Sequence, residues 1–112
     1  MSNFKELEQR VIVWAKDKGI LDKATPFKQA QKTLEEVGEL LHAIGQQDVS
    51  VGLIDVAEAN DNVQDAIGDI LVTIIIQAQM QGLTIEECLQ SAYNEIKGRK
   101  GTMVNGQFVK EV

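Results

Sequence analysis

Hydrophobic residues recur at helical spacing along most of the chain. In the first segment they fall at Phe4, Leu7, Val11 and Trp14, three or four residues apart, which predicts an amphipathic helix. We expect this helix from about Phe4 to Lys18, with Asn3 as its N-cap and Gly19 as its end.

Two longer helices are predicted in the middle of the chain. The first begins at Thr25-Pro26, a cap followed by a proline suited to the first helical position, and ends at Gly45. The second covers about 62–81 and ends at Gly82. Residues 46–61 show no sustained period, so we expect a loop there, with room for one helical turn.

The last part of the chain carries two further start signals. Thr84 and Glu87 form a capping-box pattern that predicts a fourth helix reaching about Gly98. The tail, 101–112, has Asn105-Gly106 between short apolar runs, which predicts a β-hairpin. The expected fold class is therefore all-α, a four-helix bundle with a short C-terminal hairpin, in one domain over residues 1–112.

The second predicted helix has an apolar side and an acidic side. Advancing about 100° per residue groups Leu34, Val37, Leu41 and Ile44 in one stripe, expected to be core. The opposite side carries Glu35, Glu36 and Glu39, preceded by Lys28 and Lys32. Taken alone, this side is a solvated face with Lys–Glu pairs one turn apart.

The third predicted helix is apolar nearly all round. One face holds Ile67, Ile70, Leu71, Ile74 and Ala78; another holds Val72, Ile75, Ile76 and Met80. Asp65 and Asp69 lie in line with Val72 and Ile76, so we expect both carboxylates to point at protein. A buried carboxylate costs several kcal/mol unless it is paired or binds a metal.

The two acid groups together favour a divalent cation held between these helices. Few basic residues are available to neutralise both groups, and carboxylate oxygens suit Mg²⁺, with Mn²⁺ as a substitute. Clustered acids with a single histidine do not suit zinc. Because His42 is that only histidine, the Glu39-x-x-His42 pattern cannot build a di-iron centre.

The amino-acid composition limits the kinds of binding partner that we expect. The net charge of −6 argues against a nucleic acid or an anionic membrane as partner. The apolar run 67–80 looks too short to span a bilayer. A single cysteine, Cys88, forms no internal disulfide and no secretion signal is visible, so we expect a cytoplasmic protein.

The acid pattern resembles a known family. Glu35-Glu36-Val37-Gly38-Glu39, followed by Gly68-Asp69-Ile70-Leu71, is similar to the EExxE and ExxD motifs of MazG-like all-α nucleoside triphosphate pyrophosphohydrolases. The likeness extends from about Trp14 through the tail and includes YNEIKGRKG at 93–101. It implies Mg²⁺-dependent hydrolysis of a nucleoside triphosphate to the monophosphate and pyrophosphate, by a homodimer or homotetramer.

The resemblance also implies roles for individual residues. Glu36, Glu39 and Asp69 would hold Mg²⁺, and Glu35 would orient or deprotonate the attacking water. The expected substrate contacts are Lys32, Asn94, Lys97 and Lys100. One position departs from the family pattern: Ala66 stands where ExxD has glutamate, and Asp65 is a shorter, shifted substitute.

Two other functions remain open at this stage. The Ala66 departure fits a helical adaptor or regulator that binds metal or nucleotide without turnover, and a purely structural bundle would use the acids as surface charges. For every reading we expect a homo-oligomer, because one chain has too little area to cover both faces of the third helix. The predicted interface is Val72, Ile75, Ile76 and Met80.

Overall fold

The computed structural model describes residues 3–49 and 56–112. The helices are α1 (Phe4–Asp17), α2 (Ile20–Lys23), α3 (Pro26–Val49), α4 (Val56–Met80) and α5 (Ile85–Ile96). Strands β1 (Gly101–Val104) and β2 (Gln107–Lys110) pair antiparallel. The predicted all-α fold with a C-terminal hairpin is confirmed.

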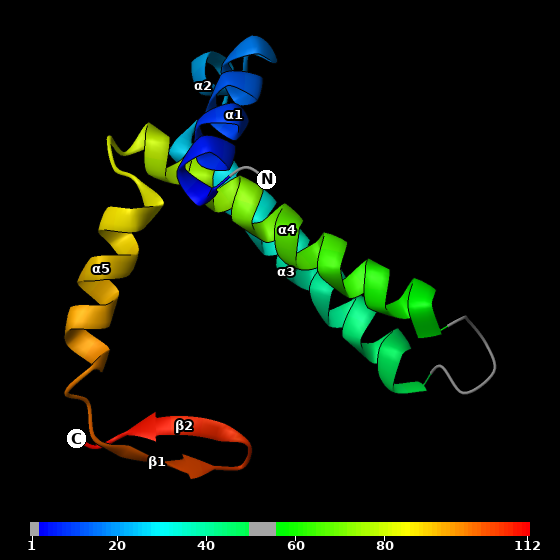
Figure 1. The fold of residues 1–112 in the computed structure, drawn as a ribbon, viewed down its shortest axis with the longest axis vertical. Helices are drawn as coiled ribbons and strands as arrows, with labels where there is room; N and C mark the ends of the chain where they lie inside the picture. Colours follow the sequence, from blue (N-terminus) through cyan, green and yellow to red (C-terminus); the bar gives the residue numbers. More distant parts are fainter. Residues whose placement is uncertain (1–2, 50–55) are drawn as a thin grey trace.

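The elements form an open V (Figure 1). One limb is the helical pair, α3 and α4 packed antiparallel along their length, with α1 and α2 near the end where α4 finishes. The other limb is the arm, α5 with the hairpin, which leaves that same end and diverges from the pair. The arm contacts its own chain mainly where α5 meets α4.

The predicted caps and turns account for the element boundaries. Asn3 Oδ1 accepts a hydrogen bond from the Glu6 N–H at 2.9 Å and starts α1. At α5 both hydrogen bonds of the capping box between Thr84 and Glu87 are present. Asn105 and Gly106 have φ values of 50° and 81°, the left-handed pair that a two-residue hairpin turn requires.

The predicted loop at 46–61 is largely wrong. Helix α3 continues past Gly45 to Val49, and α4 begins at Val56 rather than near Asn62; residues 50–55 lie outside the described part. The Gln47 side chain donates to Asn60 Oδ1 at 2.9 Å and joins the added turns. Sequence periodicity missed them because these turns carry few large apolar residues, and because one glycine is tolerated within a long helix.

The predicted faces of both long helices are also wrong. Leu34 and Leu41, expected in the core, are 73% and 69% exposed. On α4, Ile75 and Ile76, expected at an oligomer interface, are buried within the chain, and Val72 and Met80 are half-buried. The exposed large apolar residues of α4 are instead Val56, Ile67, Leu71 and Ile74.

Small and polar residues form the contact between α3 and α4. Ala43, Ala59 and Ala66 are buried there and let the two backbones approach closely. Nearer the closed end of the V, Thr33 Oγ1 donates to Thr73 Oγ1 at 2.9 Å and buried Gln29 donates to the Thr73 carbonyl at 3.1 Å. Because these small residues fill the contact between α3 and α4, Leu34 and Leu41 remain outside it.

The full length of α4 changes one expectation about membranes. By length and composition alone this helix could cross a bilayer, which the shorter predicted run could not. We attribute its apolar character to packing, because α4 contacts α3 along its length and also contacts α1 and α5. It also carries the charged residues Asp61, Asp65 and Asp69.

The observed burial of Ile76 on α4 predicts that this side chain stabilises the folded chain. Ile76→Ala should lower the free energy of unfolding by about 2–5 kcal/mol, since it leaves a cavity between packed helices. The control Val13→Ala, on the exposed side of α1, should cost less than about 0.5 kcal/mol. Chemical denaturation measures both, and equal losses would contradict this assignment of faces.

Candidate functional site

A cleft runs along one side of the helical pair and collects three of the predicted acids. Glu39 on α3 and Asp65 and Asp69 on α4 line it, and its volume is about 420 Å³. We call it the acid cleft. Its full lining is Gly38, Glu39, His42, Ala43, Gln46, Asn62, Asp65, Ala66 and Asp69.

Glu36 lies one helical turn before Glu39 and is almost buried against α4. Its side chain is 11% exposed, whereas that of Glu35 is 59% exposed. The Lys32 ammonium joins the two: Nζ is 3.3 Å from Glu35 Oε1 and 3.4 Å from Glu36 Oε1. These hydrogen bonds raise the pKa of Lys32 above its ordinary value, and the bond to Glu35 has a larger effect than the bond to Glu36.

The expectation that Asp65 and Asp69 are buried is wrong. Both residues are exposed, although they face a cleft rather than open surface. Within residues 3–49 and 56–112, no three acidic, histidine or cysteine side chains are close enough to one another to hold a metal ion. The fold therefore places the carboxylates around one cleft without bringing their oxygen atoms to a single point.

Ala66 lies inside this cleft, on the side of α4 that faces α3. It is buried at 7% exposure and contributes to the cleft lining. The side chain of a glutamate at this position would leave the backbone between the two helices. Asp65 is the neighbouring residue, about 100° away around α4, so its side chain reaches the cleft from the rim. Asp65 is thus in the right cleft but is not an equivalent replacement.

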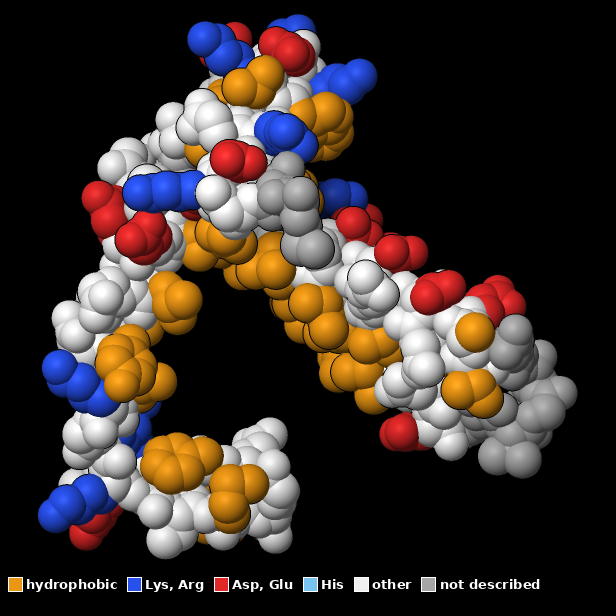
Figure 2. Space-filling model, in the orientation of Figure 1, with side chains coloured by type: hydrophobic (Ala, Val, Ile, Leu, Met, Phe, Trp, Pro, Cys, Tyr) orange, Lys and Arg blue, Asp and Glu red, His pale blue; other side chains and the backbone are white. Residues whose placement is uncertain are grey.

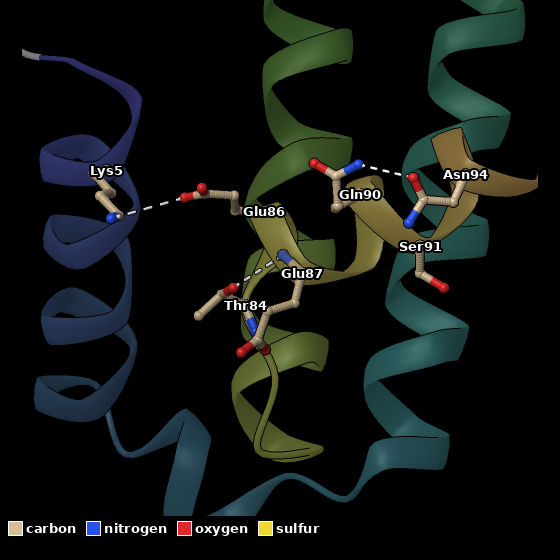
Figure 3. Close-up of a pocket in the computed structure, with 7 residues that line it drawn as sticks. All are labelled: Lys5, Thr84, Glu86, Glu87, Gln90, Ser91 and Asn94. Carbon is tan, nitrogen blue, oxygen red and sulfur yellow. Dashed lines mark hydrogen bonds and ion pairs between the residues drawn. The ribbon is translucent and has the colours of Figure 1, made fainter. Parts of the chain in front are cut away.

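The predicted substrate contacts on the arm are not brought to the acid cleft. Asn94 lines a different cavity, between α1 and α5, and its Oδ1 accepts from the Gln90 amide at 3.0 Å (Figure 3). Lys97 caps the C-terminal end of α5. Lys100 lines a shallow hollow with Arg99 and Lys110 at the far end of the arm.

Sequence reasoning missed three polar residues of the cleft. The sequence pattern gives His42 only the excluded di-iron role, puts Gln46 in the predicted loop at 46–61, and makes Asn62 only a helix start. Their spacing contained the signal: Gln46 follows Glu39 by two turns, and Asn62 precedes Asp65 by about one turn. Extending both helices would have put them on the acidic side.

Comparison with known proteins identifies the family of the chain. The model of the family described as "MazG nucleotide pyrophosphohydrolase domain" matches residues 25–104, which include α3, α4 and α5. The chain is also 29% identical over 79 residues to an "Uncharacterized 18.2 kDa protein in rep-hol intergenic region" of Haemophilus phage HP1 (strain HP1c1).

That alignment covers 70% of this chain and 42% of the phage protein, so the chain spans less than half of that relative's length. No solved structure matches the chain. The family match covers well over half of the chain and includes both helices of the acid cleft. The protein therefore belongs to the family of MazG nucleotide pyrophosphohydrolase domains.

Proposed function

We propose that the protein hydrolyses a nucleoside triphosphate between the α and β phosphates, giving a monophosphate and pyrophosphate, with Mg²⁺ in the acid cleft. Family membership supports nucleotide pyrophosphohydrolase chemistry in general. The observation that carries the proposal is the almost buried Glu36 carboxylate, held by Lys32 one turn from a cleft lined by Glu39, Asp65 and Asp69.

The donor set fits Mg²⁺ better than a softer metal. Carboxylates from two facing helices supply oxygen atoms, and they surround the cleft loosely enough to leave room for water and phosphate oxygens. Glu36, Glu39 and Asp69 would hold the ion, with Asp65 beside them. When bound, Mg²⁺ would neutralise the charge of the phosphate oxygens.

The remaining groups have separate roles. The Glu35 carboxylate is exposed, so water reaches it, and it would accept a proton from the attacking water molecule. The Lys32 side chain is a protonated ammonium held by the two glutamates, and it would bind a phosphate oxygen when it leaves them. Both residues are on α3, whose packing against α4 fixes their positions relative to Asp69.

Activity provides the first test. Purified protein should release pyrophosphate from at least one member of a panel of ribo- and deoxyribonucleoside triphosphates, with Mg²⁺ and not with EDTA. Glu39→Gln and Asp69→Asn should each lower the rate by about 100-fold or more, because each removes a charged group from the site. The matched control Asp22→Asn, on α2 away from the cleft, should retain the wild-type rate.

Absence of pyrophosphate release from every nucleotide, by folded protein, would contradict the proposal. Binding of Mg²⁺ and nucleotide without turnover would then favour the adaptor, because Ala66 removes a family carboxylate from the cleft. Equal activity of wild type and Asp69→Asn would show that hydrolysis occurs elsewhere.

Metal binding can be tested without turnover. Mg²⁺ at about 100 times its dissociation constant should raise the free energy of unfolding by about 2.7 kcal/mol at fixed protein concentration. The rise should be much smaller in Asp69→Asn and unchanged in Asp22→Asn. Thermal unfolding in NaCl of matched ionic strength is the reference, and an Mg²⁺ effect of equal size in Asp69→Asn would exclude this cleft.

The Lys32 pairing predicts a specific titration. A lysine whose folded pKa is raised contributes its full stabilisation below the unfolded value, 10.5, and loses it as pH rises through the folded pKa. Carbon-13 NMR of Lys32 Cε should therefore give a midpoint above 10.5. Glu35→Gln should lower this midpoint more than Glu36→Gln does, and Glu39→Gln should leave it unchanged. A midpoint that is the same in wild type and Glu35→Gln would contradict the pairing.

A further inference from the structure

The acid cleft can be followed from end to end along α3, because hydrogen bonds near both ends fix which residues of α4 lie level with it. Nearer the closed end of the V, Thr33 Oγ1 donates to Thr73 Oγ1 at 2.9 Å. Toward the other end, the Gln47 amide donates to Asn60 Oδ1, also at 2.9 Å. The helices run antiparallel between these bonds, so residue numbers rise along α3 as they fall along α4.

Positive charge lies beyond the carboxylates at the closed end of the V. There the Lys32 ammonium is held by Glu35 and Glu36. Lys28 precedes Lys32 by one turn on the same side of α3. Figure 2 shows acidic side chains in a row along the outer edge of the helical pair, with a basic side chain at the end of the row nearer the closed end of the V. A ligand with concentrated negative charge is therefore bound best with that charge toward this end.

The opposite end of the cleft has hydrogen-bonding side chains in place of cations. His42 and Gln46 follow one another on successive turns of α3, and Asn62 lines the cleft from α4. We call these three residues the polar end; Gln46 lies about 15 Å along α3 from Glu36. Within residues 3–49 and 56–112, their side chains form no hydrogen bond or ion pair. Their amide and imidazole groups, which can donate and accept, are therefore available to bond a ligand.

Small residues form the floor of the cleft between its carboxylates and the polar end. Ala43 of α3 and Ala66 of α4 line it, and both are buried. Because their side chains are so short, the space between the two helices stays open at this point. The cleft volume, about 420 Å³, is in the range of small-molecule sites, so the floor leaves room for a sugar and a base.

We propose that the nucleotide lies lengthwise in the acid cleft, with its two outer phosphates toward Lys32 and its nucleoside against the polar end. His42, Gln46 and Asn62 are then the residues that set the specificity for base and sugar. The hydrogen bond between Gln47 and Asn60, close to this end in both helices, holds the two amides at a fixed separation. This inference rests on the proposed function for its triphosphate substrate.

The direction of the nucleotide follows from where it carries its charge. The two outer phosphates carry most of the negative charge and leave as pyrophosphate, so they need the cations of Lys32 and Lys28. The base and sugar carry no charge and are recognised through hydrogen bonds, and glutamine and asparagine amides suit the edge of a base. In the reverse direction, pyrophosphate would lie against two amides, and the base would meet the ion pairs of Lys32.

Kinetic selectivity tests the polar end. Gln46→Ala and Asn62→Ala should each lower kcat/KM for the preferred nucleotide about 10-fold, mainly through KM, because each removes hydrogen bonds to the nucleoside. His42→Ala should act in the same direction. The ratio of kcat/KM between the preferred and the poorest base should fall in the same variants. Inorganic triphosphate, which has no nucleoside, should inhibit wild type and variants with the same inhibition constant.

The matched control is Gln64→Ala. This exposed glutamine is also on α4, two residues from Asn62, but it does not line the acid cleft. The variant should keep the wild-type kcat/KM and the wild-type order of bases. Equal loss of selectivity in Gln64→Ala and Asn62→Ala would mean that the change acts through α4 as a whole, and would overturn the assignment of Asn62.

Nuclear magnetic resonance locates the nucleoside without turnover. The probes are the α,β-imido analogues of the ribo- and deoxyribonucleoside triphosphates, titrated with Mg²⁺ into nitrogen-15 protein. The side-chain amide signals of Gln46 and Asn62 should shift, by amounts that differ between bases, and the Gln64 signal should stay. Gln31, one turn before Glu35, reports on the Lys32 end. Its amide signal should respond equally to every base.

The outcomes separate this inference from the proposed function. Active protein with the same base selectivity in wild type, Gln46→Ala and Asn62→Ala would overturn the polar end alone. Base-dependent shifts at Gln46 and Asn62, in protein that hydrolyses no nucleotide, would contradict the proposed function and support the polar end. Base-dependent shifts at Gln31 in place of Gln46 and Asn62 would reverse the direction of the nucleotide and overturn the inference, as would failure of every analogue to bind.

Discussion

The close contact between α3 and α4 sets the position of every candidate site residue on the helical pair. Buried alanines allow the backbones to approach, and the hydrogen bonds from Thr33 and Gln29 to Thr73 fix how far one helix slides along the other. Thr73 lies one turn from Asp69, and Thr33 lies nearly one turn from Glu36. The same contact that holds the subunit together therefore places carboxylates from two helices around one cleft.

Caps and the hairpin turn predicted most element boundaries, because they act on the residues beside them, whereas the helix end expected at Gly45 was wrong. Asn3, Thr84 with Glu87, and Asn105-Gly106 each mark the boundary that the structure shows. The faces of the long helices could not be obtained in the same way. Periodicity predicts Leu34 and Leu41 in the interior, whereas both are exposed and Ala43, Ala59 and Ala66 lie between the two helices. Hydrophobicity identifies surfaces that avoid water but does not say which of them a second chain covers.

The acidic residues show the same contrast between what local spacing predicts and what only the packing of the elements decides. Helical spacing predicted that the acids of the two long helices would together hold one cation. Of these acids, Glu39, Asp65 and Asp69 line one cleft in the structure. Helical spacing could not show that Glu36 alone would be almost buried, or that Lys97 and Lys100 would lie on a separate limb. The position of these lysines depends on how α1 directs the arm, through the hydrogen bond that the Glu8 carboxylate accepts from the Ile85 N–H, and no local pattern encodes it.

The central claim is that the register of α3 and α4 builds a cation site which the nucleotide completes. A crystal structure of the protein with Mn²⁺ and a nucleoside triphosphate analogue that resists cleavage between the α and β phosphates tests it most directly, because Mn²⁺ is located by its anomalous scattering. We predict anomalous density between the two helices, within ligand distance of Glu36, Glu39 and Asp69, with Lys32 displaced from Glu36 toward a phosphate. Density outside the acid cleft, or an analogue bound with Lys32 still on Glu36, would contradict it.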